Sequence, residues 1–458
     1  MPSHEATKCL PRRQFLLGSA ALALAGCAPA SMRGLDVDPA ASFGEGTPGR
    51  QAGDWWLAFQ EQQLSALIAQ GHARNLDLAQ AVEQIRAAEA GAGMARSADL
   101  PQIGATAQGQ RGDGDGSGRI SETSTAGLNV SWVLDIFGAN RNAKRAAEAR
   151  VDASRAGAAA TKLIIEGAIA AAYVDLRFYQ ANLSLTRRSL ESRRKSLELT
   201  KRQFEFGDAA KLSVVQAEQL VAEGEAQLPQ YEAGVDQAIA RLANLTAQRS
   251  AALQGTLKTS GGQPRTKFKA SVGVPAEVIR ARPDVQLAES LYQAAAYDVG
   301  VAKAAFWPSV RLGGSILPTN ISGGGNVKPW SLGPSIDLPI FTAGANRANL
   351  RAKEAKAAEA HLAWQAAVYG AIEEVEVALA SYNRDGRVVS SQQKLVETSR
   401  QAVELAQANF SIGEGAFMAV LDAERSYLGA QQGLAAAQRM RGLNFIQLSL
   451  ATAGGTAI

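Results

Sequence analysis

Few residues of this 458-residue sequence have the types and spacing that chemistry on a substrate requires. The three histidines, His4, His72 and His361, are scattered, so no histidine-based metal site is expected. The two cysteines, Cys9 and Cys27, exclude a four-cysteine zinc site and a disulfide-rich scaffold. The sequence contains no nucleophile elbow and no phosphate-binding glycine loop. An enzyme is therefore a remote alternative, and no metal or other non-covalent cofactor is expected.

Cys27 has the most specific chemical context. Arg12 and Arg13 precede an apolar run at residues 15–25, which is typical of a signal peptide and short for a membrane span. Leu-Ala-Gly then leads into Cys27, which resembles the lipobox of bacterial lipoproteins, where the cysteine thiol is acylated. An ordinary signal peptide with an incidental cysteine is the alternative. The sequence predicts a signal at 1–26, which also resembles a twin-arginine signal, and a lipid such as palmitate on Cys27.

The overall composition excludes several classes of protein. The formal charge of +4 is close to balance, so the composition gives no support for nucleic-acid binding. Mean hydropathy is -0.09, and no stretch after residue 30 approaches the ~20 continuous apolar residues of a membrane helix. The sequence therefore predicts no helical membrane span in the mature chain.

The elements that would position any site are written twice along the chain. Pro101 matches Pro308, Leu134 matches Leu338, and the segment from Arg202 matches the segment from Ala408. Subtracting the residue numbers gives offsets of 207, 204 and 206. Three matches in order at nearly one offset predict two tandem structural repeats rather than a solenoid. The predicted divisions are a signal peptide at 1–26, a lipidated linker at 27–60, repeat 1 at 61–255, an equatorial connector at 256–282, repeat 2 at 283–450 and a tail at 451–458.

Each copy combines strands with long helices. Alternating residues predict strands at about 103–111, 125–134, 309–317 and 331–340, and glycine-rich loops join each pair. Their lengths approach the ~9–11 residues of a tilted membrane strand, although a soluble hairpin in each copy is the alternative. A long helical run follows each pair and ends near Gly207 or Gly413, where a second run begins. Each copy therefore predicts a helical hairpin.

Apolar residues recur every seven positions along the long helical runs. Ile169, Leu176 and Leu183 lie on one such seam, and Val375 and Tyr382 begin the equivalent seam in the second copy. A less complete seam lies two positions later, which is nearly opposite on a helix. A helix with two opposed seams needs a neighbour on each side. This favours a tube of helices over a bundle or filament.

Taken together, these pieces resemble the TolC-like outer membrane factors, and in particular the efflux lipoproteins of resistance–nodulation–division pumps. The residues that carry the resemblance are spread over nearly the whole mature chain. They include Asp54-Trp55-Trp56, Ser131-Trp-Val-Leu-Asp-Ile-Phe-Gly138, Ala281-Arg-Pro-Asp284, Phe306-Trp-Pro-Ser309 and Val420-Leu-Asp-Ala-Glu-Arg425.

This resemblance implies an α+β membrane protein, in which a transmembrane β-barrel continues as a long α-helical barrel. Each chain would give four strands to a twelve-stranded barrel in a homotrimer, which would close the open edges that lipid cannot satisfy. The protein would be lipid-anchored in the bacterial outer membrane and extend into the periplasm. It would passively conduct small toxic compounds or drugs, supplied by an inner-membrane transporter through a periplasmic adaptor, and so serve multidrug resistance.

The resemblance also implies roles for residues near the ends of the helical hairpins. Asp422 matches an aspartate that lines the periplasmic gate, and Phe410 stands where some relatives carry a gating tyrosine. Ala419 and Gly415 replace a second aspartate and a basic residue, which predicts a single acidic ring. The expected adaptor-docking tips are Gly207, Asp208, Gly413 and Glu414, with plain helix capping as the alternative.

Two other functions remain open at this point. The first is an outer membrane duct for type I protein secretion, which would share the fold and differ in its partners. The second is a non-conducting coiled-coil scaffold of the cell envelope, which predicts neither a pore nor a stable trimer. Asp422 would then be an ordinary solvated carboxylate on a helix surface.

Overall fold

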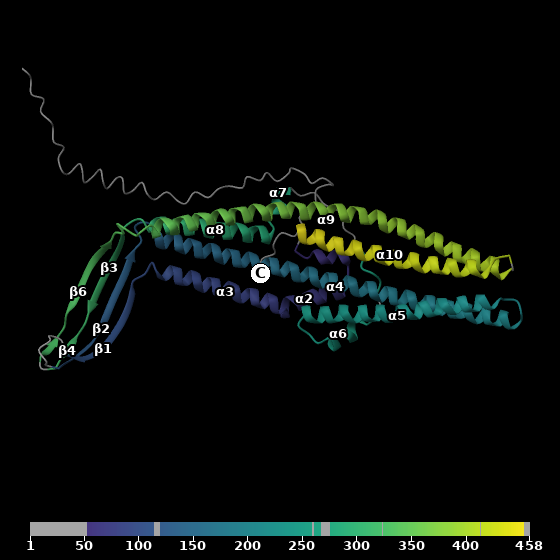
Figure 1. Ribbon diagram of the computed structural model, residues 1–458, viewed down its shortest axis with the longest axis horizontal. Coiled ribbons are helices and arrows are strands. Elements are labelled where there is room, and N and C mark those ends of the chain that lie inside the picture. Colours follow the sequence, from purple (N-terminus) through teal and green to yellow (C-terminus); the bar gives the residue numbers. More distant parts are fainter. Residues whose placement is uncertain are drawn as a thin grey trace, which may run out of the picture. The chain divides into compact units, whose positions relative to one another are not determined.

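The computed structural model describes residues 53–113, 120–258, 261–266, 275–322, 324–412 and 414–452. Most of these residues are helical, and six strands form a sheet (Figure 1). The helices are η1 (Trp55–Phe59), α2 (Gln62–Arg74), α3 (Leu76–Ser97), α4 (Ala139–Glu205), α5 (Lys211–Leu245), α6 (Ser250–Leu257), α7 (Pro275–Arg280), α8 (Pro283–Ala304), α9 (Ala345–Ser411) and α10 (Phe417–Thr452). The strands are β1 (Gln102–Gly112), β2 (Ser121–Leu134), β3 (Ser309–Ile316), β4 (Thr319–Ile321), β5 (Gly325–Val327) and β6 (Trp330–Asp337).

The two copies of the sequence repeat fold into the same order of elements. In each, a 22-residue helix leads to strands, then to a 67-residue helix and then to a helix of 35 or 36 residues. Asn140 donates a hydrogen bond to the carbonyl of Ala98 at 3.0 Å, and the equivalent Asn346 donates to Ala305 at 2.8 Å. Each asparagine therefore ties the start of a long helix to the end of the helix that precedes the strands.

The chain divides into two compact units that do not coincide with the two repeats, because each unit contains equivalent segments from both copies. Among the described residues, unit 1 contains Gln84–Arg155 and Leu287–Ala366, which include the sheet. Unit 2 contains Ala156–Gln286 and Ala367 onward, together with the segment up to Glu83. The two helical hairpins, α4 with α5 and α9 with α10, have their paired lengths in unit 2.

The sheet of unit 1 is antiparallel throughout. Its long strands lie in the order β1, β2, β3, β6, and the short β4–β5 hairpin adds to β2 beyond the end of β3. Gly127 on β2 has no room for a side chain, because a Cβ atom there would lie 2.0 Å from the carbonyl oxygen of Ile316. The packing of β2 against the end of β3 therefore requires glycine at this position.

The observed strands overlap all four predicted segments, but three details of the prediction were wrong. β2 begins at Ser121 rather than at residue 125. β6 ends at Asp337 rather than at residue 340, and Pro339 just beyond it has no N–H to donate to a sheet. The connection between β3 and β6 contains two further short strands, β4 and β5, which were not predicted. Gly325 has a φ of +85°, a conformation that glycine adopts without steric penalty and that permits the turn.

The core of unit 2 gathers around one face of each long helix. The first predicted seam is mostly buried: Ile169, Leu176 and Val375 have no exposed surface, and Leu190 and Tyr382 are nearly as deep. Towards the hairpin ends this seam becomes more open, and Phe204 is exposed. Residues of the second seam are exposed in the single chain, namely Leu199, Phe206, Val377, Leu405 and Ile412.

The N-terminal part of the described chain packs onto this core. Phe59 of η1 meets Phe445 of α10 with ring centroids 5.2 Å apart, and the rings are nearly perpendicular. Trp55 donates a hydrogen bond from Nε1 to the buried Glu166 of α4 at 3.3 Å. Burial raises the pKa of Tyr173 on the same helix to about 12, which keeps the phenol neutral. These contacts fix the start of the described chain on unit 2.

One described helix, α4, contains a window that is apolar enough to cross a membrane by length and composition alone. More than half of that window is buried inside the protein. A core helix of a soluble assembly passes the same test, so the window by itself indicates burial rather than a membrane span.

Candidate functional site

The sheet of unit 1 has one apolar and one polar face. Directly paired residues on antiparallel strands share a face, so the register identifies both sets. The apolar face carries Ile103 and Ala105 of β1, Leu128, Val130, Trp132 and Leu134 of β2, Val310, Leu312 and Ile316 of β3, and Trp330, Leu332 and Ile336 of β6. The other face carries mainly Gln, Thr, Ser, Asn and Gly side chains.

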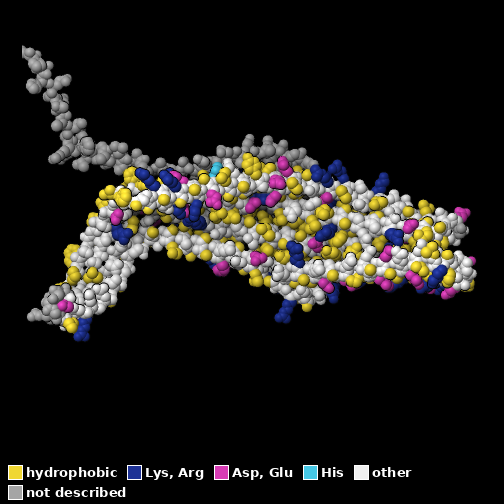
Figure 2. Space-filling model, in the orientation of Figure 1, with side chains coloured by type: hydrophobic (Ala, Val, Ile, Leu, Met, Phe, Trp, Pro, Cys, Tyr) yellow, Lys and Arg dark blue, Asp and Glu magenta, His cyan; other side chains and the backbone are white. Residues whose placement is uncertain are grey.

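Much of the apolar face is open in the single chain. Ile103, Leu128, Trp330, Leu332 and Ile336 all have at least half of their surface exposed. Figure 2 shows few charged side chains over the sheet on the face in view. A charged pair, Arg111 with Glu122 at 3.4 Å, lies at the end of β1 and β2 that is farther from the helices of unit 1. Exposed apolar surface of this size marks a site of contact with lipid or protein.

The sheet also has two long open edges. β1 pairs with β2, and β6 pairs with β3, and on the opposite side of each the described residues provide no further strand. An unpaired edge leaves a row of N–H and C=O groups that bind another strand readily. Inside a membrane such groups must be paired, because lipid offers no hydrogen bonds.

The end of the first helical hairpin is a defined helix cap. Asp208 N–H bonds the carbonyl of Gln203 at 2.8 Å, and Gly207 N–H bonds that of Phe204 at 3.0 Å. Gly207 has a φ of +86°, so the pattern is a Schellman motif with glycine at its left-handed position. The cap gives Gly207 a structural role, and it leaves the side chain of Asp208 exposed to solvent.

The second hairpin shares one of these bonds, because Glu414 is equivalent to Asp208 and Asn409 to Gln203. The N–H groups of Glu414 and Gly415 both bond the carbonyl of Asn409, at 3.0 and 3.1 Å. Glu414 is exposed, as Asp208 is in the first hairpin. Gly413, the fourth predicted tip residue, lies outside the described residues. The three described tip residues are thus at solvent-facing hairpin ends, where a partner could reach them.

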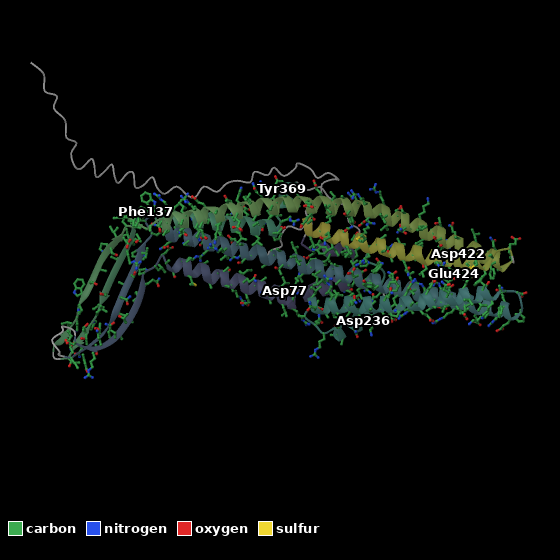
Figure 3. The ribbon with its side chains drawn as sticks, viewed as in Figure 1. Asp77, Phe137, Asp236, Tyr369, Asp422 and Glu424 are labelled. Carbon is green, nitrogen blue, oxygen red and sulfur yellow. The ribbon has the colours of Figure 1, made fainter. Side chains whose placement is uncertain are left out.

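Asp422 and Phe410 lie close to this second hairpin end. Asp422 is in the second turn of α10, with 64% of its side chain exposed (Figure 3). Its carboxylate lies 3.7 Å from the guanidinium of Arg425, one turn further along the helix. Phe410 is half-buried, and its ring centroid lies 5.3 Å from that of Phe417 across the turn. Asp422 is therefore free to face a lumen, whereas Phe410 helps to close the hairpin.

Sequence reasoning did not single out two buried charged residues in this region. Glu424 of α10 and Arg193 of α4 are both more than nine-tenths buried. Each has a side-chain atom with no hydrogen-bond partner among the described residues, Oε2 of Glu424 and Nε of Arg193. The available signal was the repeat itself, because Glu424 is equivalent to Glu218, which pairs with Lys201, and Lys201 is replaced by Gln407 in the second copy.

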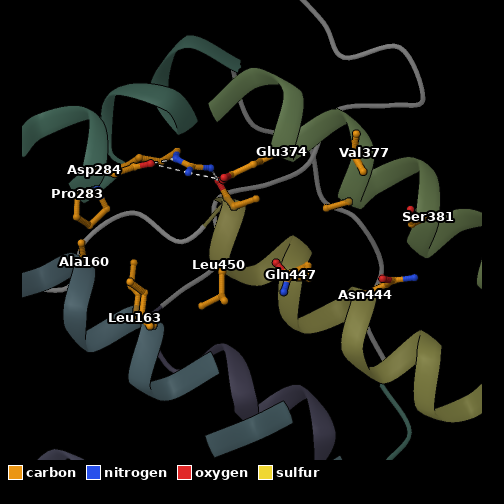
Figure 4. Close-up of a pocket in the computed structure, with 14 residues that line it drawn as sticks. Ala160, Leu163, Pro283, Asp284, Glu374, Val377, Ser381, Asn444, Gln447 and Leu450 are labelled. Atoms are coloured by element: carbon orange, nitrogen blue, oxygen red, sulfur yellow. Dashed lines mark hydrogen bonds and ion pairs between the residues drawn. The ribbon is translucent and has the colours of Figure 1, made fainter. Parts of the chain in front are cut away.

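A second feature of unit 2 is a cavity of about 530 Å³ between α4, α9, α10 and the start of α8 (Figure 4). Leu163 and Leu450 contribute apolar surface, and Arg282 binds Asp284 at 2.7 Å and Glu374 at 2.5 Å beside it. Burial alone would raise the pKa of Asp284, but the bonds from Arg282 hold it below its ordinary value. The ion pairs at this cavity therefore join the start of α8 to α9 through Arg282, in the turn that precedes α8.

The two described histidines have structural surroundings. His72 Nε2 lies 2.8 Å from the buried carboxylate of Glu166, and His361 packs against the rings of Tyr292 and Trp364. Within the part of the chain that the structure describes, no cluster of three or more potential metal ligands is found. Cys27, Arg12 and Arg13 lie outside the described residues.

The sequence matches the model of a known family, described as outer membrane efflux protein, over residues 67–248 and 274–454. Nodulation protein T of Rhizobium leguminosarum bv. viciae is 35% identical over 423 residues, which cover 91% of this chain and 88% of the relative. Outer membrane protein OprJ of Pseudomonas aeruginosa is 30% identical over 452 residues, which cover 95% of this chain and 94% of the relative.

Solved structures give the same result at the level of the fold. The outer-membrane channel OprN aligns with a TM-score of 0.87 and 29% identity, over 93% of this chain and 99% of that one. The open state of the MtrE outer membrane channel of Neisseria gonorrhoeae aligns with a TM-score of 0.80 and 27% identity, over 93% of this chain and 98% of that one. The sheet, the paired long helices and both halves of the repeat are thus shared with outer membrane channels, and the chain belongs to the outer membrane efflux protein family.

Proposed function

We propose that three copies of this outer membrane efflux channel form one continuous duct, in which a twelve-stranded β-barrel leads into a tube of twelve long helices. The observation that carries this proposal is the sheet of unit 1, with its exposed apolar face and two long open edges. Pairing β1 of one copy with β6 of the next would satisfy both edges and turn the apolar face towards lipid. The polar face would then line a water-filled lumen.

The long helices support the same assembly. Val377, Leu405 and Ile412 of the second seam are exposed in the single chain, although their periodicity is that of packed helices. A neighbouring copy on that side would bury them and complete the wall of the tube. An isolated protomer leaves them in water, which is unfavourable by roughly 25 cal/mol for each Å² of apolar surface.

Transport through the duct would be passive, with an inner-membrane transporter as the source of energy and a periplasmic adaptor joining the two. Relatives differ in what their names say they carry. One is a toluene efflux pump outer membrane protein of Pseudomonas putida, and another is a cation efflux system protein of Escherichia coli. The proposed cargo of this chain is accordingly small toxic compounds or drugs, selected mainly by the pump.

The proposed gate is the end of the second helical hairpin, α9 with α10, where Asp422 of each copy would face the axis. Three carboxylates at one constriction would attract cations and repel anions, and salt would screen both effects. Ala419 and Gly415 leave this ring without the second aspartate and basic partner expected by resemblance. The solvent-facing tips, Asp208 and Glu414, are the proposed sites of adaptor docking.

The gate can be tested by single-channel conductance of the purified full-length protein in planar bilayers. Asp422→Ala should raise conductance and lower cation preference severalfold, because the acidic ring is lost. Asp236→Ala is the matched control, since Asp236 is an exposed carboxylate on α5, outside the proposed constriction. Unchanged conductance and ion preference in Asp422→Ala would remove Asp422 from the gate. Absence of any channel activity in the wild type would instead contradict the duct itself.

A further inference from the structure

The two helical hairpins are equivalent in the repeat, but they are held together differently. In hairpin 1 (α4 with α5), three ion pairs cross between the helices at seven-residue intervals. They are Arg187 with Glu232 at 2.8 Å, Arg194 with Glu225 at 2.7 Å and Lys201 with Glu218 at 3.0 Å. All six side chains are about half exposed, so each pair remains solvated at any pH where the carboxylates are ionised.

Hairpin 2 (α9 with α10) lacks the residues for this ladder. The equivalent positions, 206 residues later, hold Gln393 with Gln438, Arg400 with Gln431 and Gln407 with Glu424. None of these combinations can form an ion pair across the hairpin. Arg400 instead binds Glu397 and Glu404 on its own helix. The position next to the hairpin end is the one that keeps its glutamate, Glu424.

Glu424 differs from its counterpart Glu218 in being buried. Its Oε1 accepts a hydrogen bond from Ser192 of α4 at 3.2 Å and another from Gln407 of α9 at 3.4 Å. Its Oε2 has no hydrogen-bond partner among the described residues. One carboxyl group therefore joins three helices. It lies two residues beyond Asp422 on α10 (Figure 3).

The charges around Glu424 do not pair with it directly. Arg193 of α4 faces it from within the core, but its Nη1 donates to the carbonyl of Leu220 at 2.7 Å. The negative charge of Glu223 on α5 stabilises the charged form of Arg193. The guanidinium of Arg425 lies 4.0 Å from the carboxylate of Glu223 and 3.7 Å from that of Asp422. A buried carboxylate with one unbonded oxygen and no close ion pair is costly when ionised.

We propose that Glu424 is a positioning residue for the gate: in its neutral form it holds α10 against α4 and α9, and its ionisation loosens hairpin 2 while hairpin 1 stays clamped. The effect of this residue on conduction rests on the proposed gate at Asp422, but its role in packing does not. The packing itself depends on the contacts of Glu424 and can be measured separately.

The direction of the pH effect follows from burial. Burial raises the pKa of Glu424 above its ordinary value of 4.5, although the bonds from Ser192 and Gln407 and the charge of Arg193 oppose the shift. The packed state therefore binds this proton more tightly than a loosened state in which the carboxyl reaches water. Its extra stability is complete below the ordinary pKa and is lost as the pH rises through the raised one. Hairpin 2 should loosen as the pH rises.

The test is hydrogen exchange of the full-length protein in detergent between about pH 5 and pH 8, which lies above the ordinary pKa of a glutamate carboxyl. The ratio of exchange in residues 417–430 to exchange in residues 211–224 cancels the intrinsic pH dependence, because the second segment is the equivalent part of hairpin 1. In the wild type this ratio should rise severalfold with pH. Glu424→Gln, which cannot ionise, should hold it flat at the low-pH value.

Two variants complete the experiment. Glu218→Gln removes the exposed equivalent and should leave the wild-type pH profile intact. Gln407→Lys rebuilds the pairing of hairpin 1 opposite Glu424 and should also flatten the profile, because the ionised carboxylate gains a partner. A wild-type profile in Glu424→Gln, or a profile lost equally in Glu218→Gln, would overturn the proposal. If exchange follows Glu424 while conductance does not, the packing role stands and the gate at this hairpin end fails.

Discussion

Arg282 joins segments of unit 2 that are far apart in the sequence. Its guanidinium is nearly fully buried and bonds Asp284 at the start of α8, Glu374 on α9 and the carbonyl of Ala451 near the end of α10. Burial lowers the pKa of Arg282, but its carboxylate partners more than compensate and raise it overall. Both carboxylates are partly exposed, so the ion pairs themselves add little to stability. The main effect of the cluster is to fix the relative positions of the segments that it joins.

Replacing this residue tests that role. Arg282→Ala leaves two carboxylates and one carbonyl without their shared donor and opens space beside the existing cavity. We expect a loss of about 2 kcal/mol in the stability of unit 2. Arg280→Ala is the control, because Arg280 is exposed and is the last residue of α7, two residues before Arg282. Thermal unfolding followed by circular dichroism measures the difference, and equal midpoints for the two variants would contradict it.

At the scale of elements, strand faces and helix seams determine what the chain can contact. Trp330, Leu332 and Ile336 alternate with Ser331, Gly333 and Ser335 along β6, so one strand separates an apolar from a polar surface. Similarly, the first seam of each long helix is buried inside the chain over much of its length, and most residues of the second seam are left exposed. The apolar face of the strand and the second seam of each helix are therefore exposed until lipid or another protein surface covers them.

A pair of neighbouring substitutions on β6 tests the assignment of the faces. Leu332→Arg places a charge on the apolar face and should cost about 2–4 kcal/mol in a membrane-inserted barrel. Ser331→Arg adds the same charge one residue earlier, on the polar face, and should be tolerated. The amount of heat-modifiable oligomer recovered from outer membranes measures the effect. Similar recovery of both variants would mean that the apolar face does not contact lipid.

For the whole molecule, two features could hold the protein at the outer membrane, namely the proposed barrel and the proposed lipid on Cys27. They are not equivalent, because acyl chains on one residue bury far less apolar surface than a closed barrel, which buries an entire apolar band. The barrel should therefore dominate retention once the copies have assembled. The lipid would act mainly before assembly, when the sheet edges are still open.

The Cys27→Ser variant separates these contributions. Incorporation of labelled palmitate should be lost, because no other cysteine remains in the predicted mature chain. Heat-modifiable oligomer should still be found in the outer membrane, in reduced amount. Sucrose-gradient fractionation with the labelled wild type beside it is the measurement. Palmitate retained in Cys27→Ser would contradict the predicted lipidation site.

Local sequence determined much of this protein. Heptad spacing placed the long helices, alternation placed four strands, and glycines marked the hairpin ends, because each pattern acts over a few consecutive residues. The repeat determined the order of elements without reference to tertiary structure. Resemblance to a family added the oligomer, the partners and Asp422, none of which periodicity could provide.

Only the tertiary structure decided the environments of particular charged residues. Glu218 and Glu424 occupy the same place in the repeat, yet one is solvated beside Lys201 and the other is buried against α4 and α9. The short β4–β5 hairpin also depends on β2, which lies almost 200 residues earlier. Burial depends on which helices and strands that are distant in the sequence pack together, and a local sequence pattern contains no information about that packing.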